Sequence, residues 1–178
     1  LSLGERDPEK AAEAMLERAI LLEERLQQPE QAVAALEILV ARLDPGNIDA
    51  HDALARLYEA RGDYPSAVRI AERQMYLATD AEAKIARGMG IALICRDQLG
   101  DRHRALQALE RVLGLDANHR QALQAAAELY EGVEDWLNYN AVLERQVDLA
   151  TDSEERRALM SRVATILAER MNDPEAAF

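Results

Sequence analysis

Residues 72–80 read Glu-Arg-Gln-Met-Tyr-Leu-Ala-Thr-Asp, and residues 144–152 read Glu-Arg-Gln-Val-Asp-Leu-Ala-Thr-Asp. The two stretches share Glu-Arg-Gln and Leu-Ala-Thr-Asp at a spacing of 72 residues. The same spacing places residues 44–82 over residues 116–154, with 16 of 39 positions identical. Chance gives only a few such matches, so the chain contains an internal repeat, and a fixed period of this kind is typical of repeat architectures.

Prolines and glycines fall almost entirely between segments whose apolar residues have helical periodicity. The breaks pair a capping Asp or Asn with a turn former, as in Asp44-Pro45-Gly46-Asn47 and Gly62-Asp63-Tyr64-Pro65. Such a segment ends one helix and starts the next. We therefore expect an all-helical chain with helices at 8–26, 30–43, 48–61, 65–78, 81–99, 102–115, 119–131, 136–150 and 154–171, and a further helix beginning at residue 174.

Connections of two to five residues fold each helix back on its predecessor, which produces helical hairpins. An early position in each second helix marks the period: Ala32, Ala67, Ala105, Tyr139 and Ala177, at spacings of 35, 38, 34 and 38 residues. Short and long hairpins therefore alternate. The prediction is a single repeat array over residues 1–178, with hairpins at 8–43, 48–78, 81–115, 119–150 and a truncated one at 154–178.

The hairpin that begins at Ile48 resembles the tetratricopeptide repeat (TPR), a helix-turn-helix unit of about 34 residues with the pattern W-x2-L-G-x2-Y, then A-x3-F, then P. The residues at these positions are His51, Leu54-Ala55, Tyr58, Ala67 with Ala71, and Thr79 in place of the proline. The hairpin from Arg120 departs from the pattern because Tyr139 occupies a small-residue position. The long hairpins match in their small residues but lack the aromatics, and other α-solenoid families share hairpins of similar length, so the subfamily stays open.

The resemblance implies a right-handed α-solenoid, a TPR-like superhelix in which stacked hairpins bury one another's apolar faces. It also implies an extended concave face, lined by the first helices, that binds proteins or peptides. The function expected is a non-catalytic interaction scaffold within a longer array. An architectural spacer without a ligand is the alternative, and a regulatory region of an enzyme lying outside this segment is a third.

Composition excludes several other classes of protein. The formal net charge is -12, with 21 basic and 33 acidic residues, so a nucleic acid or an anionic membrane would be repelled. One cysteine, Cys95, forms no internal disulfide, and three scattered histidines form no zinc site with it. No apolar run is long enough to span a membrane. Arg outnumbers Lys 19 to 2, which suggests a bacterial source, and we expect a cytoplasmic fragment.

The sequence holds none of the motifs for phosphate loops, metalloproteases, serine hydrolases or Cys-x-x-Cys sites, so we expect no catalytic residues, no cofactor and no metal. His51, His103 and His119 lie in three different hairpins and are interpreted as structural residues. Gly88-Met89-Gly90 lies inside a predicted helix, where close packing of a neighbouring helix explains the glycines better than a nucleotide does. Trp136 is interpreted as a core residue.

The family register assigns positions 2, 5, 9 and 12 of each first helix to the concave face. The resulting candidate binding residues are Asp49, Asp52, Arg56, Glu59, Arg87, Ile94, Asp97, Gln121, Gln124, Glu128, Glu131, Leu159, Arg162 and Ile166. This set lacks the Lys, Arg and Asn constellation with which some family members hold a terminal carboxylate. We therefore expect a basic partner, or one with apolar anchors that meet Ile94 and Ile166, rather than an acidic one.

The last hairpin stops in the first turn of its second helix, at Phe178. Val163, Ile166 or Leu167 would then lack the cover of a full hairpin. An uncapped end of a repeat array tends to associate, so we expect self-association through this end.

Overall fold

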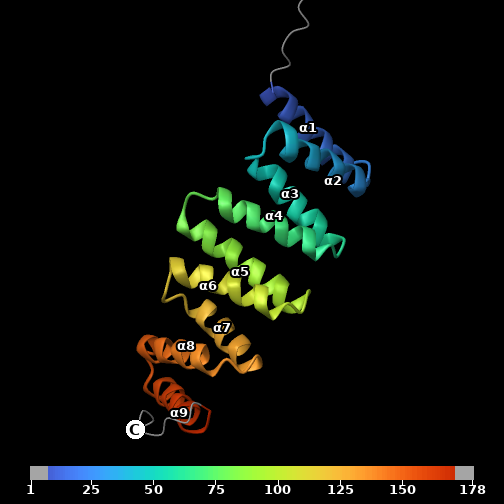
Figure 1. Cartoon of the computed structure of the whole chain (residues 1–178). Helices are drawn as coiled ribbons and strands as arrows, with labels where there is room; N and C mark the ends of the chain where they lie inside the picture. The colour runs from blue at the N-terminus through green and yellow to red at the C-terminus, as the bar shows by residue number, and fades with distance from the viewer. Residues whose placement is uncertain (1–7, 171–178) are drawn as a thin grey trace, which may run out of the picture. The chain divides into compact units, whose positions relative to one another are not determined.

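The computed structural model describes residues 8–170, and every regular element in that range is helical. The elements are α1 (Pro8–Glu24), α2 (Pro29–Ile38), the π-helical segment η1 (Leu39–Leu43), α3 (Ile48–Ala60), α4 (Tyr64–Leu77), α5 (Ala81–Asp97), α6 (Arg102–Leu115), α7 (Arg120–Gly132), α8 (Trp136–Leu149) and α9 (Ser153–Glu169) (Figure 1). The fold is an all-α helical repeat solenoid, as predicted. The helix expected from residue 174 lies outside the described residues.

The segment 30–43 is a correction, because the sequence predicts one continuous α-helix there. The α-helix ends at Ile38, and residues 39–43 widen into a π-helix in which the Asp44 N–H donates to the Leu39 carbonyl at 2.9 Å. A π-helix bonds each residue to the one five positions earlier, so it accommodates one more residue per turn. Apolar periodicity does not distinguish this geometry from an α-helix.

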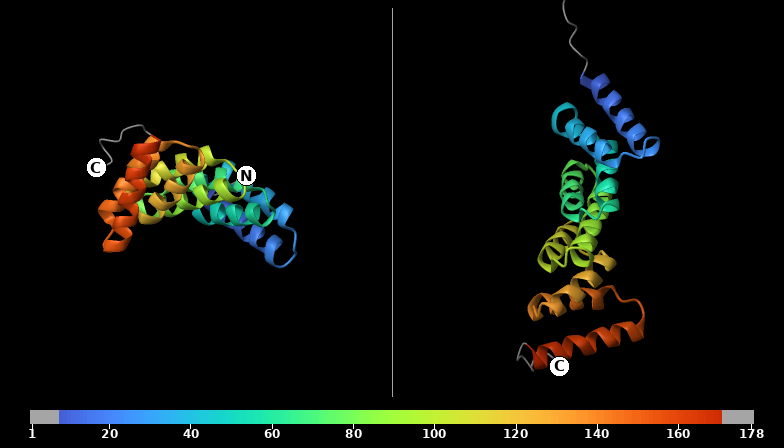
Figure 2. Two further views of the ribbon diagram at one scale, coloured as in Figure 1. Left: turned by 90° about the horizontal axis from the view of Figure 1, so that it is seen from below. Right: turned by 90° about the vertical axis from the view of Figure 1, so that its right-hand side faces the viewer.

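The chain divides into two compact units, Leu1–Thr79 and Asp80–Phe178. The boundary falls at the Thr79-Asp80 capping segment, where Asp80 accepts a hydrogen bond from the Ala83 N–H at 2.8 Å and so starts α5. Within each unit the hairpins follow one another in chain order (Figure 2). The single array over residues 1–178 stays a prediction.

Each of the four complete hairpins turns through one residue with a left-handed backbone. These residues are Gln27, Gly62, Gly100 and Glu134, with φ values of 54°, 71°, 63° and 58°. Their spacings of 35, 38 and 34 residues equal those predicted for the second helices. The residue after each of the last three is an Asp that caps the second helix through its carboxylate. The turn and the cap together fix where α4, α6 and α8 begin, whereas Gln28 before α2 forms no side-chain cap bond.

Small residues allow the two helices of a hairpin to approach closely. Ala32, Ala67 and Ala105 are 0%, 1% and 0% exposed. Tyr139 occupies the same position of α8 and is also buried, with its ring 6.1 Å from that of Trp136 in an edge-on arrangement. The larger side chain is therefore accommodated inside the hairpin stack. Trp136 packs against it but is half-buried, so it does not lie inside the core as interpreted from the sequence.

The same tyrosine-to-glutamate hydrogen bond links successive hairpins in both units. In the first unit the Tyr58 hydroxyl on α3 donates to Glu37 on α2 at 2.5 Å, and in the second the Tyr130 hydroxyl on α7 donates to Glu110 on α6 at 2.9 Å. Burial, with the bonded glutamate adding to it, raises the pKa of Tyr58 to about 12 and also raises that of Tyr130. Both bonds require a neutral phenol.

Two further expectations concern the histidines and the glycine at position 90. His51 is 2% exposed and lies in the core, and Nδ1 of His119 accepts a hydrogen bond from the Ala122 N–H at the start of α7. Gly90 does not follow its prediction. It is exposed, and a Cβ added there would meet no atom within 4 Å, so close packing does not explain this glycine.

Glu134 provides a direct test of the turn geometry. Replacing Glu134 with Gly removes the cost of a left-handed non-glycine residue, about 1–2 kcal/mol, and adds unfolded-state entropy of about 0.4–1 kcal/mol. We expect Glu134→Gly to stabilise the protein by about 0.5–1 kcal/mol in urea denaturation. Gly62→Ala, at the equivalent turn, is expected to destabilise it, and equal effects of the two substitutions would contradict the role of the turn.

The tyrosine bonds predict a loss of stability in alkali. The folded-state pKa of Tyr58 lies above the unfolded value of 10, so its contribution is complete below pH 10 and is lost as the pH rises through about 12. We expect Tyr58→Phe to cost about 1 kcal/mol at pH 8. The difference from the unmodified chain should shrink between pH 10 and 12, measured by denaturant unfolding at each pH. Parallel stability curves would show that the contribution of the hydroxyl does not depend on its protonation, and coincident curves would show that it contributes nothing.

Candidate functional site

The predicted binding residues lie on first helices of the hairpins, namely α3 in the first unit and α5, α7 and α9 in the second. We call the surface that they form in each unit its first-helix face. The polar members are exposed, except for the half-buried Arg87. The apolar members are less accessible, because Ile94 and Leu159 are half-buried and Ile166 is 9% exposed. The accessible part of each face is therefore polar.

Ile166 requires a correction in both of its predicted roles. Residues Val163, Ile166 and Leu167 fall on one stripe of α9, and α9 packs against α8. Val163 is half-buried, while Ile166 and Leu167 are buried. The packing of α9 on α8 thus covers Ile166, which offers neither an exposed anchor point nor a bare apolar end.

The first-helix face of the first unit carries an arginine that is paired inside the fold and two carboxylates that are not paired within residues 8–170. Arg56 on α3 pairs with Glu23 on α1 through two hydrogen bonds, one of them 3.0 Å long. These contacts raise the pKa of Arg56. The carboxylates of Asp49 and Glu59, near the two ends of α3, form no hydrogen bond or ion pair within residues 8–170. This face therefore presents two carboxylates that the fold does not use.

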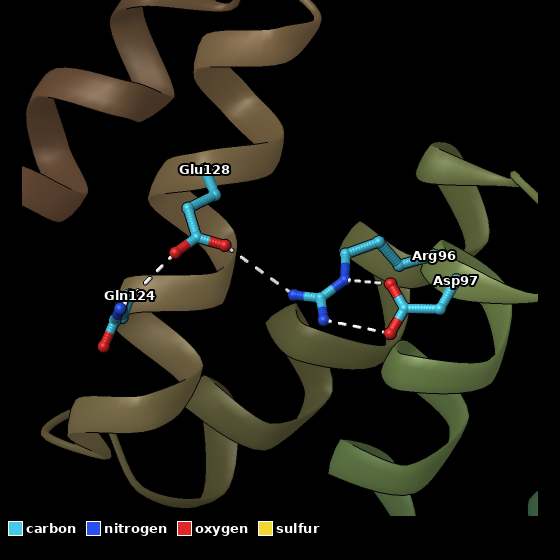
Figure 3. Close-up of polar contacts among 4 residues, drawn as sticks. All are labelled: Arg96, Asp97, Gln124 and Glu128. Carbon is cyan, nitrogen blue, oxygen red and sulfur yellow. Dashed lines mark hydrogen bonds and ion pairs between the residues drawn. The ribbon is translucent and has the colours of Figure 1, made fainter.

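In the second unit, Arg96 links two first helices (Figure 3). Its guanidinium donates to both oxygens of Asp97, at 2.6 and 3.1 Å, and lies 3.7 Å from Glu128 on α7. The hydrogen bond from Arg96 lowers the pKa of Asp97. Gln124, one turn earlier on α7, donates to Glu128 at 3.4 Å. The structure brings Asp97, Gln124 and Glu128 together, as predicted residues of one face, through an arginine that the prediction omits.

Arg162 provides the corresponding link between α7 and α9. Its guanidinium lies 3.6 Å from Glu131, donates to the Tyr139 hydroxyl and covers the Tyr139 ring at 5.5 Å. Burial raises the pKa of Tyr139, and the positive charge of Arg162 opposes that shift. The predicted residues Glu131 and Arg162 therefore contact each other directly.

A pocket of about 410 Å³ opens on this face between α7, α8 and α9. Three of its residues, Gln124, Leu159 and Arg162, belong to the predicted set. The others are Arg120, Leu123, Gln146, Leu149 and Glu155. Arg120 donates to the Leu149 carbonyl, and Arg156 donates to the Ala150 carbonyl at 2.9 Å, so two arginines cap the carboxyl end of α8 beside the pocket.

The residues that the prediction omits carried only weak signals. Arg96 occupies the tyrosine position of its repeat, so it registers as a departure from the pattern rather than as a polar link. Arg120 is the first residue of α7, ahead of the register positions. Gln146 lies in the repeated Glu-Arg-Gln block, and the equivalence with Gln74 is the one signal that singles it out.

Two further findings concern metal ions and membranes. Among residues 8–170 no group of three or more His, Cys, Asp or Glu side chains is arranged to hold a metal ion. In the same range, no helix has both the length and the apolar character that crossing a membrane requires.

Comparisons with known proteins match two segments of the chain to a known repeat. Residues 13–45 and 50–84 each match a family model of the tetratricopeptide repeat. The solved structure of YrrB, described as a TPR protein with an unusual peptide-binding site, shares the fold with a TM-score of 0.51 at 16% identity, over 97% of this chain and 88% of YrrB. The solved structure of MamA AMB-1 shares the fold with a TM-score of 0.54 at 15% identity, over 96% of this chain and 87% of MamA. No curated protein matches the sequence.

Proposed function

We propose that this chain, which has a tetratricopeptide-like helical repeat fold, is an interaction scaffold whose first-helix faces bind partner proteins or peptides. The proposal includes no catalytic step. The similar fold of YrrB, a TPR protein with a peptide-binding site, supports a peptide as one kind of ligand.

The observation that carries the proposal is that two carboxylates on α3, those of Asp49 and Glu59, have no partner within the described residues. Arg56 on the same helix is paired with Glu23. By contrast, the side chains of Asp49 and Glu59 are exposed and form no hydrogen bond or ion pair within the described residues. With a net charge of -12 for the whole chain, such a face attracts cationic segments. The partner we propose for the first unit is therefore basic.

A charge reversal tests this proposal against an architectural spacer. We expect Asp49→Lys with Glu59→Lys to weaken binding of Arg-containing nine-residue peptides about five- to tenfold at low salt, measured by fluorescence anisotropy. Matched Glu-containing peptides should bind less tightly than the basic ones to the unmodified chain.

The control variant combines Glu30→Lys with Asp148→Lys, which makes the same change of charge on second helices. Glu30 lies in the first turn of α2 and Asp148 in the last turn of α8, so the positions along the helix also match those on α3. An equal loss in both double variants would refute a specific face. An unmodified chain that binds basic and acidic peptides equally would leave the spacer as the function.

A second copy of the chain is a further partner that we propose, through α9. In the described part of α9 the buried residues are Ile166 and Leu167, while Met160 is 54% exposed. Light scattering over an about hundredfold concentration range should show a rising mass, which Met160→Glu should reduce. Leu137→Glu changes an exposed apolar residue of α8 and serves as the control. A constant monomer mass for the unmodified chain would rule this partner out.

A further inference from the structure

Two equivalent positions of the repeat differ between the units. In the first unit, Gln74 on α4 is 7% exposed, and its amide donates to the Asp52 carboxylate on α3 at 2.6 Å. Seventy-two residues later the same positions hold Gln146 on α8 and Gln124 on α7. Gln124 donates to Glu128 instead, and Gln146 is half-buried with no hydrogen bond from its side chain within residues 8–170.

The side chains of Gln124 and Gln146 both line the pocket of about 410 Å³ between α7, α8 and α9. Pockets of about 300–1,000 Å³ are the size that encloses small ligands or parts of larger ones. Asp52 and Gln74 are joined across α3 and α4, whereas the two glutamines that replace them are not joined across α7 and α8. In the second unit, Gln124 stands at the position that Asp52 occupies in the first. The side-chain amide of Gln146, at the position of Gln74, therefore has no hydrogen-bond partner within the described residues.

The walls of this pocket are held in place by contacts outside its interior. Arg120 donates to the carbonyl of Leu149, the last residue of α8, and Arg156 donates to the next carbonyl at 2.9 Å. On the other side, Arg162 is fixed by Glu131 and by Tyr139. A site that is already ordered loses little entropy when a ligand binds.

The lining selects the chemistry of the ligand. Leu149 on α8 and Leu159 on α9, both half-buried, supply accessible apolar surface, while Leu123 on α7 lies in the wall and is 0% exposed. The rim carries charges of both signs, because Arg120 bonds to a neutral carbonyl and Glu155 forms no ion pair within the described chain. An uncharged side chain suits such a pocket, and the unused amide of Gln146 offers a donor and an acceptor that match a peptide group.

We propose that this pocket binds an extended peptide segment, with an aliphatic side chain such as leucine on Leu149 and Leu159 and a backbone peptide group on the Gln146 amide. This inference rests on the proposed function and assigns one chemical class of partner to the second unit. It differs from the basic partner assigned to the face of α3.

The substitution Gln124→Asp tests the proposal without removing any core side chain. It restores in the second unit the Asp and Gln pair of the first, so the Gln146 amide gains an internal partner and the pocket closes. Gln107→Asp makes the same change of charge at an exposed position of α6 that does not line the pocket. Thermal unfolding of both variants checks that they remain folded.

The probe is the peptide acetyl-Ser-Gly-Ser-Leu-Ser-Gly-Ser-amide, titrated by NMR into the full chain. We expect shifts in the Gln146 side-chain amide and in the methyl groups of Leu149 and Leu159. The affinity should fall at least about fivefold when Ala, Asp or Lys replaces the central leucine, and at least about tenfold in Gln124→Asp, with Gln107→Asp unchanged. Equal affinities of the two variants, or no preference for leucine, would overturn the proposal.

The outcome for this pocket is separable from that for the proposed function. A chain that discriminates basic peptides through Asp49 and Glu59 but gives no shifts with the leucine peptide overturns the pocket and leaves the scaffold standing. Shifts confined to the pocket, in a chain whose α3 charge reversal has no effect, support the pocket and overturn the basic partner.

Discussion

The burial of one hairpin by the next is the constraint on which the rest of this structure depends. A single amphipathic hairpin cannot cover its own apolar stripe, so each one needs a neighbour. The fully buried Ala32, Ala67 and Ala105 bring the two helices of a hairpin together, and the Tyr58 and Tyr130 hydroxyls join one hairpin to the helix before it. First helices are thereby placed beside one another, and their remaining surface becomes available for binding.

The sequence predicts this arrangement well because its signals are local and repeated. Turn residues and caps recur at spacings of 35, 38 and 34, and each depends on the conformation of one or two residues. The π-helical widening at 39–43 was not predictable in this way, because it depends on one backbone bond, from Asp44 to Leu39, that leaves the apolar pattern unchanged. Gly90 likewise has a sequence signal, a glycine inside a helix, but no packing partner in the structure that accounts for it.

The binding surface was predictable in its helices but less so in its side chains. The register placed the polar candidates on exposed positions, whereas Ile166 lies at the same kind of position and is buried by the packing of α9 on α8. The pairing of charges was not predictable either. A long side chain such as that of Arg96 or Arg162 reaches across to the neighbouring helix and decides which carboxylates stay unpaired. Such reach depends on the distance between helices, which no pattern within one helix contains.

The hairpin with a large side chain at the small-residue position is also the one beside the pocket. At the position of the three alanines α8 carries Tyr139, and at the next it carries Asn140, where the other second helices have Val33, Val68 and Leu106. Asn140 is 7% exposed, and its side-chain oxygen has no hydrogen-bond partner, which is a cost to stability. Residues that weaken a core without a local gain are expected where function constrains the sequence. Tyr139 has such a role, because its hydroxyl and ring hold Arg162 against the wall of the pocket. The irregular core of this hairpin and the open pocket on its face are therefore two aspects of one local departure from the repeat.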